Sequence, residues 1–203
     1  MARDKQRGKQ PDKPSDKPED PRVLRTRADV ARAAAELLID QGWDRVTHAN
    51  VAAASGYSRA TLYKHWPQIT DLLRAGFLHI GGLPHGEVTG DLRQDLISEM
   101  EAFRRVLIDD RLAVSLVALA DRSTASADIA KLRDQFMGDG QSLLRELISK
   151  GIRARALRDG IKVGPAADML SGALVLRVAV MGKRVGRGYI EAIVDIFLHG
   201  TAK

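Results

Sequence analysis

A short polar run in the first half of the chain carries the side chains best suited to specific chemistry. Arg59, Thr61, Tyr63, Lys64 and His65 follow one another closely. Their side chains donate hydrogen bonds, and two of them are always cationic at neutral pH, so the run suits contact with phosphate groups and base edges of duplex DNA. The chemistry that it indicates is recognition of nucleic acid.

The rest of the sequence offers no catalytic constellation. It has no G-x-S-x-G, P-loop or H-E-x-x-H motif and no cysteine. The five histidines are scattered, and although His79 and His85 could share a metal ion with Glu87, loop histidines are the simpler interpretation. Gly186 and Gly188 lack the preceding strand and third glycine of a dinucleotide fingerprint, so they predict a turn between helices. We therefore expect no enzyme, no metal and no cofactor.

Two short helices joined by a tight turn are predicted around the polar run. In THANVAAASGYSRATLYKHW, residues 47–66, Ala52 is small where one helix must cross another closely. Gly56 can take the left-handed conformation that ends the first helix, and Ser58 suits the N-cap of the second. Leu62 and the tryptophan four residues later face the core, which leaves the polar side chains outside. This pattern predicts a helix-turn-helix whose second helix enters the DNA major groove; an ordinary helical hairpin with a solvated outer face stays open as an alternative.

The surrounding residues resemble the TetR family of one-component bacterial transcriptional regulators, from Arg27 to about Leu73. The resemblance rests on the segments ELLIDQGWDRVT and VAAASGYSRATLYKHWP and on a further helix starting near DLL. The family usually has a lysine two residues after the proline and then an acidic residue, whereas Ile69 and Thr70 stand here; Thr70 can still cap the next helix. The positions that match the family pattern are Thr47, Ser58, Thr61, Leu62, Tyr63, His65, Trp66 and Pro67.

The motif and the resemblance together predict a binding surface for a double-stranded DNA operator. It combines the outward side of the second motif helix, the start of the first motif helix and basic residues just before the fold, which can add phosphate contacts. The candidate DNA-binding residues are Arg25, Arg27, Thr47, His48, Ser58, Arg59, Ala60, Thr61, Tyr63, Lys64 and His65.

Composition indicates a folded, non-secreted protein. Its 203 residues, 44% of them hydrophobic, suffice for one core or two coupled ones, and the net charge is +6. No cysteine, apolar leader or long membrane span occurs, so we expect a cytoplasmic protein that does not enter a membrane. Residues 1–21 hold four prolines and alternating charges, which predicts a disordered arm. A DNA-binding domain at 22–82 and an effector-binding and dimerisation domain at 83–203 would follow.

Only helical patterns continue beyond Pro84, so the predicted fold is all-α. A three-helix helix-turn-helix head joins a C-terminal helical bundle, with about nine helices in all. Outside the motif, the expected helices cover residues 26–41, about 70–80, 91–108, 111–121, 127–150, 164–182 and 187–199.

The helix within residues 168–180 is apolar nearly all round, and the last helix shows the same excess. Such a helix must be covered on two sides, one of them by something outside its own domain. We expect a homodimer through the last two helices, an arrangement that the family resemblance also implies. The predicted interface residues are Val175, Ile190, Ile193 and Phe197.

The family resemblance further implies a small-molecule pocket in the C-terminal part. Ordinary core packing is the alternative for each apolar candidate, and Arg177 could anchor an anionic effector, pair with an acidic neighbour or bond the backbone. The candidate pocket residues are Met100, Phe103, Leu116, Leu119, Phe136, Met137, Leu174 and Arg177.

Taken together, these features predict a repressor that leaves a near-palindromic operator when an unidentified small-molecule effector binds. Two other classes stay open: a small helical enzyme, which the missing catalytic motifs disfavour, and a helical adaptor that binds a protein partner through its last two helices.

Overall fold

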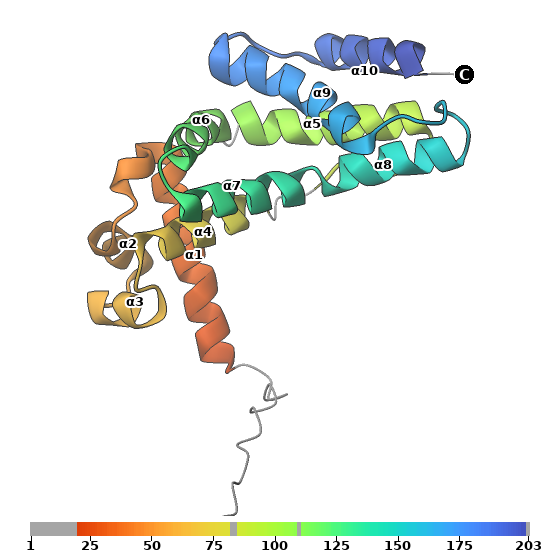
Figure 1. Ribbon diagram of the computed structural model, residues 1–203. Helices are drawn as coiled ribbons and strands as arrows, with labels where there is room; N and C mark the ends of the chain where they lie inside the picture. Colours follow the sequence, from red (N-terminus) through yellow and green to blue (C-terminus); the bar gives the residue numbers. More distant parts are fainter. Residues whose placement is uncertain (1–19, 82–84, 109–110, 202–203) are drawn as a thin grey trace, which may run out of the picture.

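The structure, a computed structural model, describes residues 20–81, 85–108 and 111–201 (Figure 1). These residues form ten α-helices and no strand, which confirms the all-α fold. They also contain a short 3-10 helix, η1, and a π-helical turn, η2. The elements are α1 (Pro21–Gln41), η1 (Trp43–Arg45), α2 (His48–Ser55), α3 (Arg59–His65), α4 (Ile69–Gly81), α5 (Leu92–Ile108), α6 (Leu112–Ser123), α7 (Ala127–Gly140), α8 (Ser142–Arg153), α9 (Val163–Val175), η2 (Leu176–Val180) and α10 (Arg187–Thr201).

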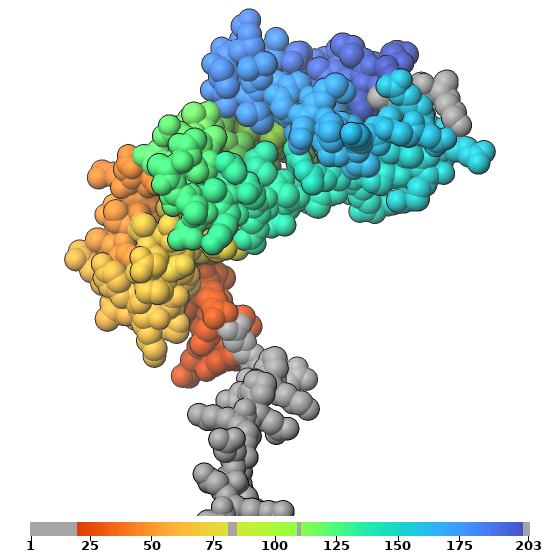
Figure 2. Space-filling view, in the orientation of Figure 1, coloured from red at the N-terminus to blue at the C-terminus, as the bar shows by residue number. Residues whose placement is uncertain are grey.

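The helices are arranged as a head and a body. Helices α1 to α4 form the head at one end, and α9 with α10 lies at the far side of the body (Figure 1). The space-filling view shows α2 and α3 projecting at the surface of the head, well away from α10 (Figure 2). One cluster of buried apolar side chains nevertheless runs from Val30 in α1 through Phe77 in α4 to Phe197 in α10. The head and the body therefore share one continuous hydrophobic core.

Helix α1 begins earlier than its apolar periodicity predicts. Its N-cap is Asp20, whose side chain accepts a hydrogen bond from the amide of Arg22 at 2.9 Å, and Pro21 occupies the first turn. Proline suits this position because its missing N–H would have no intrahelical partner there. The expected start near Thr26 was therefore wrong, and the last two residues of the predicted arm belong to the helix start; residues 1–19 lie outside the described residues.

The single helix expected over residues 127–150 is two helices, α7 and α8, which raises the expected nine helices to ten. The break falls at Gly140 and Gln141, and Gln141 has φ −101° and ψ 3°. Its side-chain amide donates to Ser171 at 2.8 Å and to Asp168 at 3.2 Å in α9. Glycine weakens the helix locally, and these contacts from a distant helix fix the bend.

Candidate nucleic-acid interface and effector cavity

The predicted helix-turn-helix is present in the head. The hydroxyl of Thr47 caps α2 by accepting from the amide of Asn50 at 3.1 Å. Gly56 ends α2 with φ +77°, the left-handed conformation that only glycine adopts without a steric penalty. Ser58 caps α3 by accepting from the amide of Thr61 at 3.1 Å. These local bonds fix where α3 begins and how it leaves α2.

Helix α3 presents a polar face to solvent. Leu62 is fully buried and Trp66, its C-cap residue, is buried too, so these two side chains hold α3 on the head. Tyr63 is 56% exposed although it is aromatic. The exposed residues of α3 are Arg59, Ala60, Tyr63, Lys64 and His65, all from the predicted set. The electrostatic and hydrogen-bonding character of this face fits a DNA groove.

Three residues of the predicted set serve mainly to shape this face. The hydroxyls of Ser58 and Thr61 lie 2.8 Å apart and hydrogen-bond to each other at the front of α3. Thr47 is half-buried, and its hydroxyl already serves the cap of α2.

His48 does not have the exposed position expected of a DNA contact. It is buried, and its Nε2 lies 2.6 Å from the carbonyl oxygen of Trp66. Its ring stacks against Tyr63 with centroids 4.0 Å apart and planes 13° apart. His48 therefore ties the start of α2 to the end of α3 and supports the exposed tyrosine, a role that its position one residue after the cap did not reveal.

The first turns of α1 lie beside α3. Arg25 and Arg27, both predicted, are exposed there. A shallow groove between the two helices is lined by Arg22, Val23, Thr26, Arg27, Thr61, His65 and Trp66. Arg22, another of the basic residues just before the fold that the sequence indicates for phosphate contacts, is exposed and also lines this groove.

The start of α4 differs from the expectation that Thr70 caps it. The carboxylate of Asp71 accepts a hydrogen bond from the amide of Gln68 at 2.9 Å, and the carbonyl of Gln68 accepts from the amide of Asp71 at 3.0 Å. A carboxylate in the first turn is well suited to this capping hydrogen bond because it also lies at the positive end of the helix dipole. Ile69, which stands where the family usually has a lysine, is exposed.

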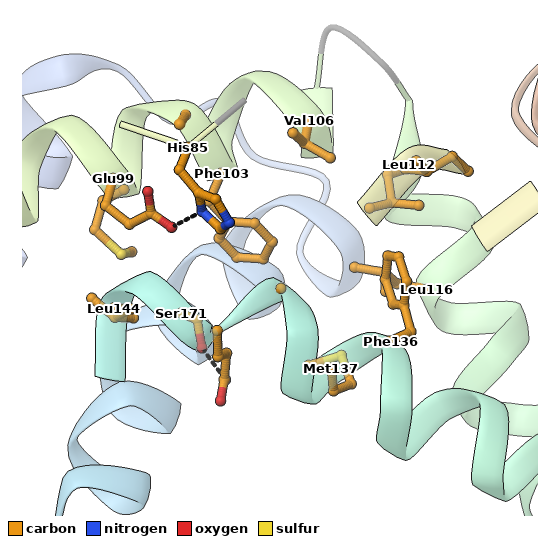
Figure 3. A pocket seen from close by; sticks show the side chains of 15 residues that line it. His85, Glu99, Phe103, Val106, Leu112, Leu116, Phe136, Met137, Leu144 and Ser171 are labelled. Carbon is orange, nitrogen blue, oxygen red and sulfur yellow. Dashed lines mark hydrogen bonds and ion pairs between the residues drawn. The ribbon is translucent and has the colours of Figure 1, made fainter. Parts of the chain in front are cut away.

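A mostly apolar cavity of about 70 Å³ lies in the body between α5, α6, α7 and α8 (Figure 3). One of its walls comes from the head, because Ile80 of α4 lines it. Five of the predicted pocket residues line this cavity: Met100, Phe103, Leu116, Phe136 and Met137.

Three other predicted pocket residues lie elsewhere. Leu119 and Leu174 are buried in the core and do not line the cavity. Arg177 lies in η2, where its Nε donates to the carbonyl of Arg184 at 3.1 Å and its guanidinium sits 4.3 Å from the ring centre of Tyr189. The apolar pattern around Arg177 suggests a buried charge, but the residue is half-buried and fastens the link between η2 and α10.

The polar side of the cavity was not predicted. His85 and Glu99 point toward each other at its edge (Figure 3), with Nδ1 of His85 2.8 Å from Oε1 of Glu99. The other carboxylate oxygen of Glu99 accepts from the amide of Gly86 at 2.8 Å. No local pattern in the sequence signals this pair, because the partners come from a loop and a helix.

A second carboxylate of α5 holds the same loop. Asp95 is buried and accepts hydrogen bonds from the amides of Thr89 at 2.6 Å and Gly90 at 3.1 Å. Burial by itself would raise the pKa of Asp95, but the hydrogen bonds from Thr89 and Gly90 lower that pKa below its ordinary value. Asp95 is therefore a carboxylate at neutral pH.

An apolar surface runs along α9, η2 and α10. By length and composition alone the segment Val163–Val180 could cross a membrane, with a mean hydropathy of 1.5, yet only 28% of it is buried in the protomer. The expected interface residues Ile190 and Phe197 do not face this surface, because they are 0% and 1% exposed inside the protomer. Val175 and Ile193 are partly buried. The large side chains exposed along these elements are Met169, Leu176, Val180, Met181 and Ile196.

Two family models match the chain. Residues 30–75 match the bacterial regulatory proteins of the tetR family. Residues 87–197 match the tetracyclin repressor-like C-terminal domain, and this second match covers more than half of the chain.

Individual proteins are similar over most or part of the chain. The HTH-type transcriptional regulator YdeS of Bacillus subtilis (strain 168) is 25% identical over 176 residues, which cover 86% of this chain and 88% of YdeS. The DNA-binding transcriptional repressor TetR of Mycobacteroides abscessus is 35% identical over 80 residues, covering 38% of this chain and 42% of that protein. The solved structure of the TetR family transcription regulator SCO0332 matches with a TM-score of 0.72 and 28% identity, covering 88% of this chain and 99% of that one.

Proposed function

Because this chain belongs to the TetR family and is a DNA-binding transcriptional regulator, we propose that it is a repressor released from a near-palindromic operator by a small molecule. The observation that carries the proposal is that a helix of the DNA-binding head, α4, supplies a wall of the apolar cavity through Ile80. A molecule in that cavity therefore touches the head directly. The cytoplasm is the compartment in which such a protein meets its DNA.

The DNA-contacting surface in this proposal is the exposed face of α3 with the start of α1. Arg59, Tyr63, Lys64 and His65 would enter or flank the major groove, while Arg22 and Arg25 of α1 would contact phosphates. His48 would act indirectly, by holding Tyr63 in place through the stacked rings.

A second copy of this chain would cover the apolar surface of α9, η2 and α10. Four large side chains chosen from this surface, Met169, Leu176, Val180 and Ile196, are more than half exposed in the protomer. Helices so apolar need cover, and a symmetric pairing of the same surface satisfies both copies at once. Pairing would also place two recognition helices on one DNA duplex, about 34 to 36 Å apart or at a wider spacing set by the dimer.

The path from cavity to head runs through α4. Phe136 lines the cavity and packs edge-on against Phe77 of α4 with ring centroids 5.1 Å apart. Arg74 of the same helix donates to Gln135 of α7 at 3.3 Å. A ligand that displaces Phe136 would therefore shift α4, and α4 packs against α1 in the head core.

A second connection joins α6 to the other side of the head. Arg122 pairs with Asp44 at 2.9 Å and its guanidinium lies 5.2 Å from the ring centre of Trp43. Ser115 of α6 donates to the carbonyl of Leu38 at 3.2 Å. Helix α6 also lines the cavity, so a ligand there touches this connection as well. The ligand can change the distance between the two heads of the dimer only to the extent that it binds one dimer arrangement more tightly than the other.

The test of this proposal is a gel shift with the duplex DNA upstream of the protein's own gene. The expected result is a discrete protein–DNA complex that survives excess non-specific DNA and dissociates when a cavity ligand is added. A matched variant, Phe136→Leu, should still bind DNA but respond differently to ligand, because it removes the ring that links the cavity to Phe77. No specific complex with the upstream DNA would refute the proposal.

A further inference from the structure

A strap of backbone, residues 85–90, crosses the first turns of α5 and is held there by two buried carboxylates one helical turn apart. Asp95 holds its far end through Thr89 and Gly90. Glu99 holds its near end through His85 and Gly86, both at 2.8 Å. Only Glu99 of these two carboxylates lines the cavity.

The two bonds to Glu99 differ in how easily they can be exchanged. A Cβ on Gly86 would fall on the backbone of Ser98 and Glu99, so the strap lies directly on α5. The hydrogen bond from the Gly86 amide to the Glu99 carboxylate is therefore fixed. The His85 side chain is 41% exposed, whereas the Glu99 side chain is 6% exposed. The imidazole can therefore turn out to water at little cost, while the carboxylate cannot leave the cavity wall.

The charge of the cavity selects among ligands. Among the lining residues that the structure describes, Glu99 and His85 are the only ionisable side chains, and neither lysine nor arginine is among them. A carboxylate can only accept hydrogen bonds, so the His85 Nδ1–H donates to it. An anionic ligand would meet this carboxylate with no lysine or arginine in the cavity wall to offset it, while a protonated amine would supply a charge-assisted donor.

We propose that the ligand of this cavity is an apolar molecule carrying a protonated amine, which binds the Glu99 carboxylate in place of His85. The inference rests on the proposed function, since it takes the cavity to be the effector site. The apolar part of the ligand would pack on Phe103, Phe136 and Met137, and its ammonium group would lie at the edge where the strap begins.

The ligand would also contact the DNA-binding head. Ile80, in the last turn of α4, lines the same cavity as His85 and Glu99. A ligand that displaces His85 therefore touches the head through this wall of the cavity.

The test uses the full-length protein and two matched series of probes at neutral pH. One series is octylammonium, 1-octanol and octanoate, and the other is 2-phenylethylammonium, 2-phenylethanol and phenylacetate. Isothermal titration calorimetry should show that at least one ammonium ion binds about tenfold or more tightly than its alcohol and its carboxylate, the usual size of a lost charged hydrogen bond.

Three variants locate the effect. Glu99→Gln should remove the preference for the ammonium ion while leaving the alcohol's affinity unchanged. Glu101→Gln, which changes a carboxylate of α5 that pairs with Arg104 instead of facing the cavity, should keep the preference. His85→Ala should keep the preference and should bind the ammonium ion more tightly, because the competing donor is gone. If Glu99→Gln does not fold, this expected gain in affinity still tests the inference.

Several outcomes would overturn the inference. They are the absence of any preference for the ammonium ion in both series, a preference that survives in Glu99→Gln, and no binding of either ammonium ion at about 1 mM. Operator binding of the wild-type protein is measured in parallel. If the protein binds its operator and the amine preference is absent, the ligand class is wrong; if it binds no operator, the proposed function is wrong whatever the amines do.

Discussion

Lys64 and Tyr63 share the exposed face of α3, and Lys64 offers the cleaner test of a phosphate contact. Replacing Lys64 with alanine should weaken binding to all duplex sequences alike and reduce the slope of log affinity against log salt by about one, because one fewer counterion is released. Fluorescence anisotropy at several salt concentrations measures this slope. Lys162→Ala, which changes an exposed lysine before α9, should leave it unchanged. An unaltered slope in Lys64→Ala would remove this residue from the interface.

His48 is a structural residue under the DNA-binding face. His48→Ala should lower the free energy of unfolding by about 1–3 kcal/mol, because the buried carbonyl of Trp66 loses its partner. The same variant should also weaken DNA binding, since Tyr63 loses the ring on which it stacks. Urea unfolding measures the first effect and anisotropy the second. His65→Ala on the exposed side of α3 is the control; if it destabilised the protein as much as His48→Ala, the assigned role of His48 would be wrong.

At the scale of elements, the strap on α5 gives a pH-dependent contribution to stability. The folded state lowers the pKa of Asp95 below that of the unfolded chain, which is about 3.9. Its contribution is therefore fully present above that unfolded value and is lost as the pH falls through the lower, folded value. Asp95→Asn should reduce stability at neutral pH and flatten the acid side of the stability profile. Chemical unfolding between about pH 7 and pH 3 checks this, and a variant with the wild-type acid slope would contradict it.

Elements that depend on neighbouring residues are predictable from the sequence. Thr47, Gly56 and Ser58 set the caps and the turn of the helix-turn-helix within a short stretch, so local residue types alone are enough to place α2 and α3. The break between α7 and α8 is not predictable in this way, because Gln141 is held by Ser171 of α9, which lies thirty positions further along the chain.

Side-chain direction was harder to predict than element position. In a helix that is apolar all round, periodicity does not tell which side meets the protomer core, and Ile190 and Phe197 proved to be core residues while Ile196 is 71% exposed. The same limit affected the cavity. Apolar residue type indicated Met100 and Phe103, which line it, but nothing local linked His85 to Glu99.

At the scale of the whole molecule, the proposed dimer can be tested through Ile196. Aspartate at this position leaves the protomer core untouched, so the variant should fold, yet it would bury a charge between two copies at a cost of several kcal/mol. Sedimentation at micromolar concentration should show a monomer. Leu78→Asp, at an exposed apolar position on α4, should remain a dimer. A dimeric Ile196→Asp variant would place the interface elsewhere.

The paired reading of DNA by two recognition helices is tested most directly by changing the spacing of the two half-sites in the operator and measuring affinity. If one dimer reads both half-sites, inserting five base pairs turns one half-site to the opposite side of the duplex, about half of a 10–10.5 base-pair turn. We predict that this insertion lowers affinity about tenfold or more, since one recognition helix loses its base contacts. Affinity that stays the same after the insertion would contradict the proposal that one dimer reads both half-sites.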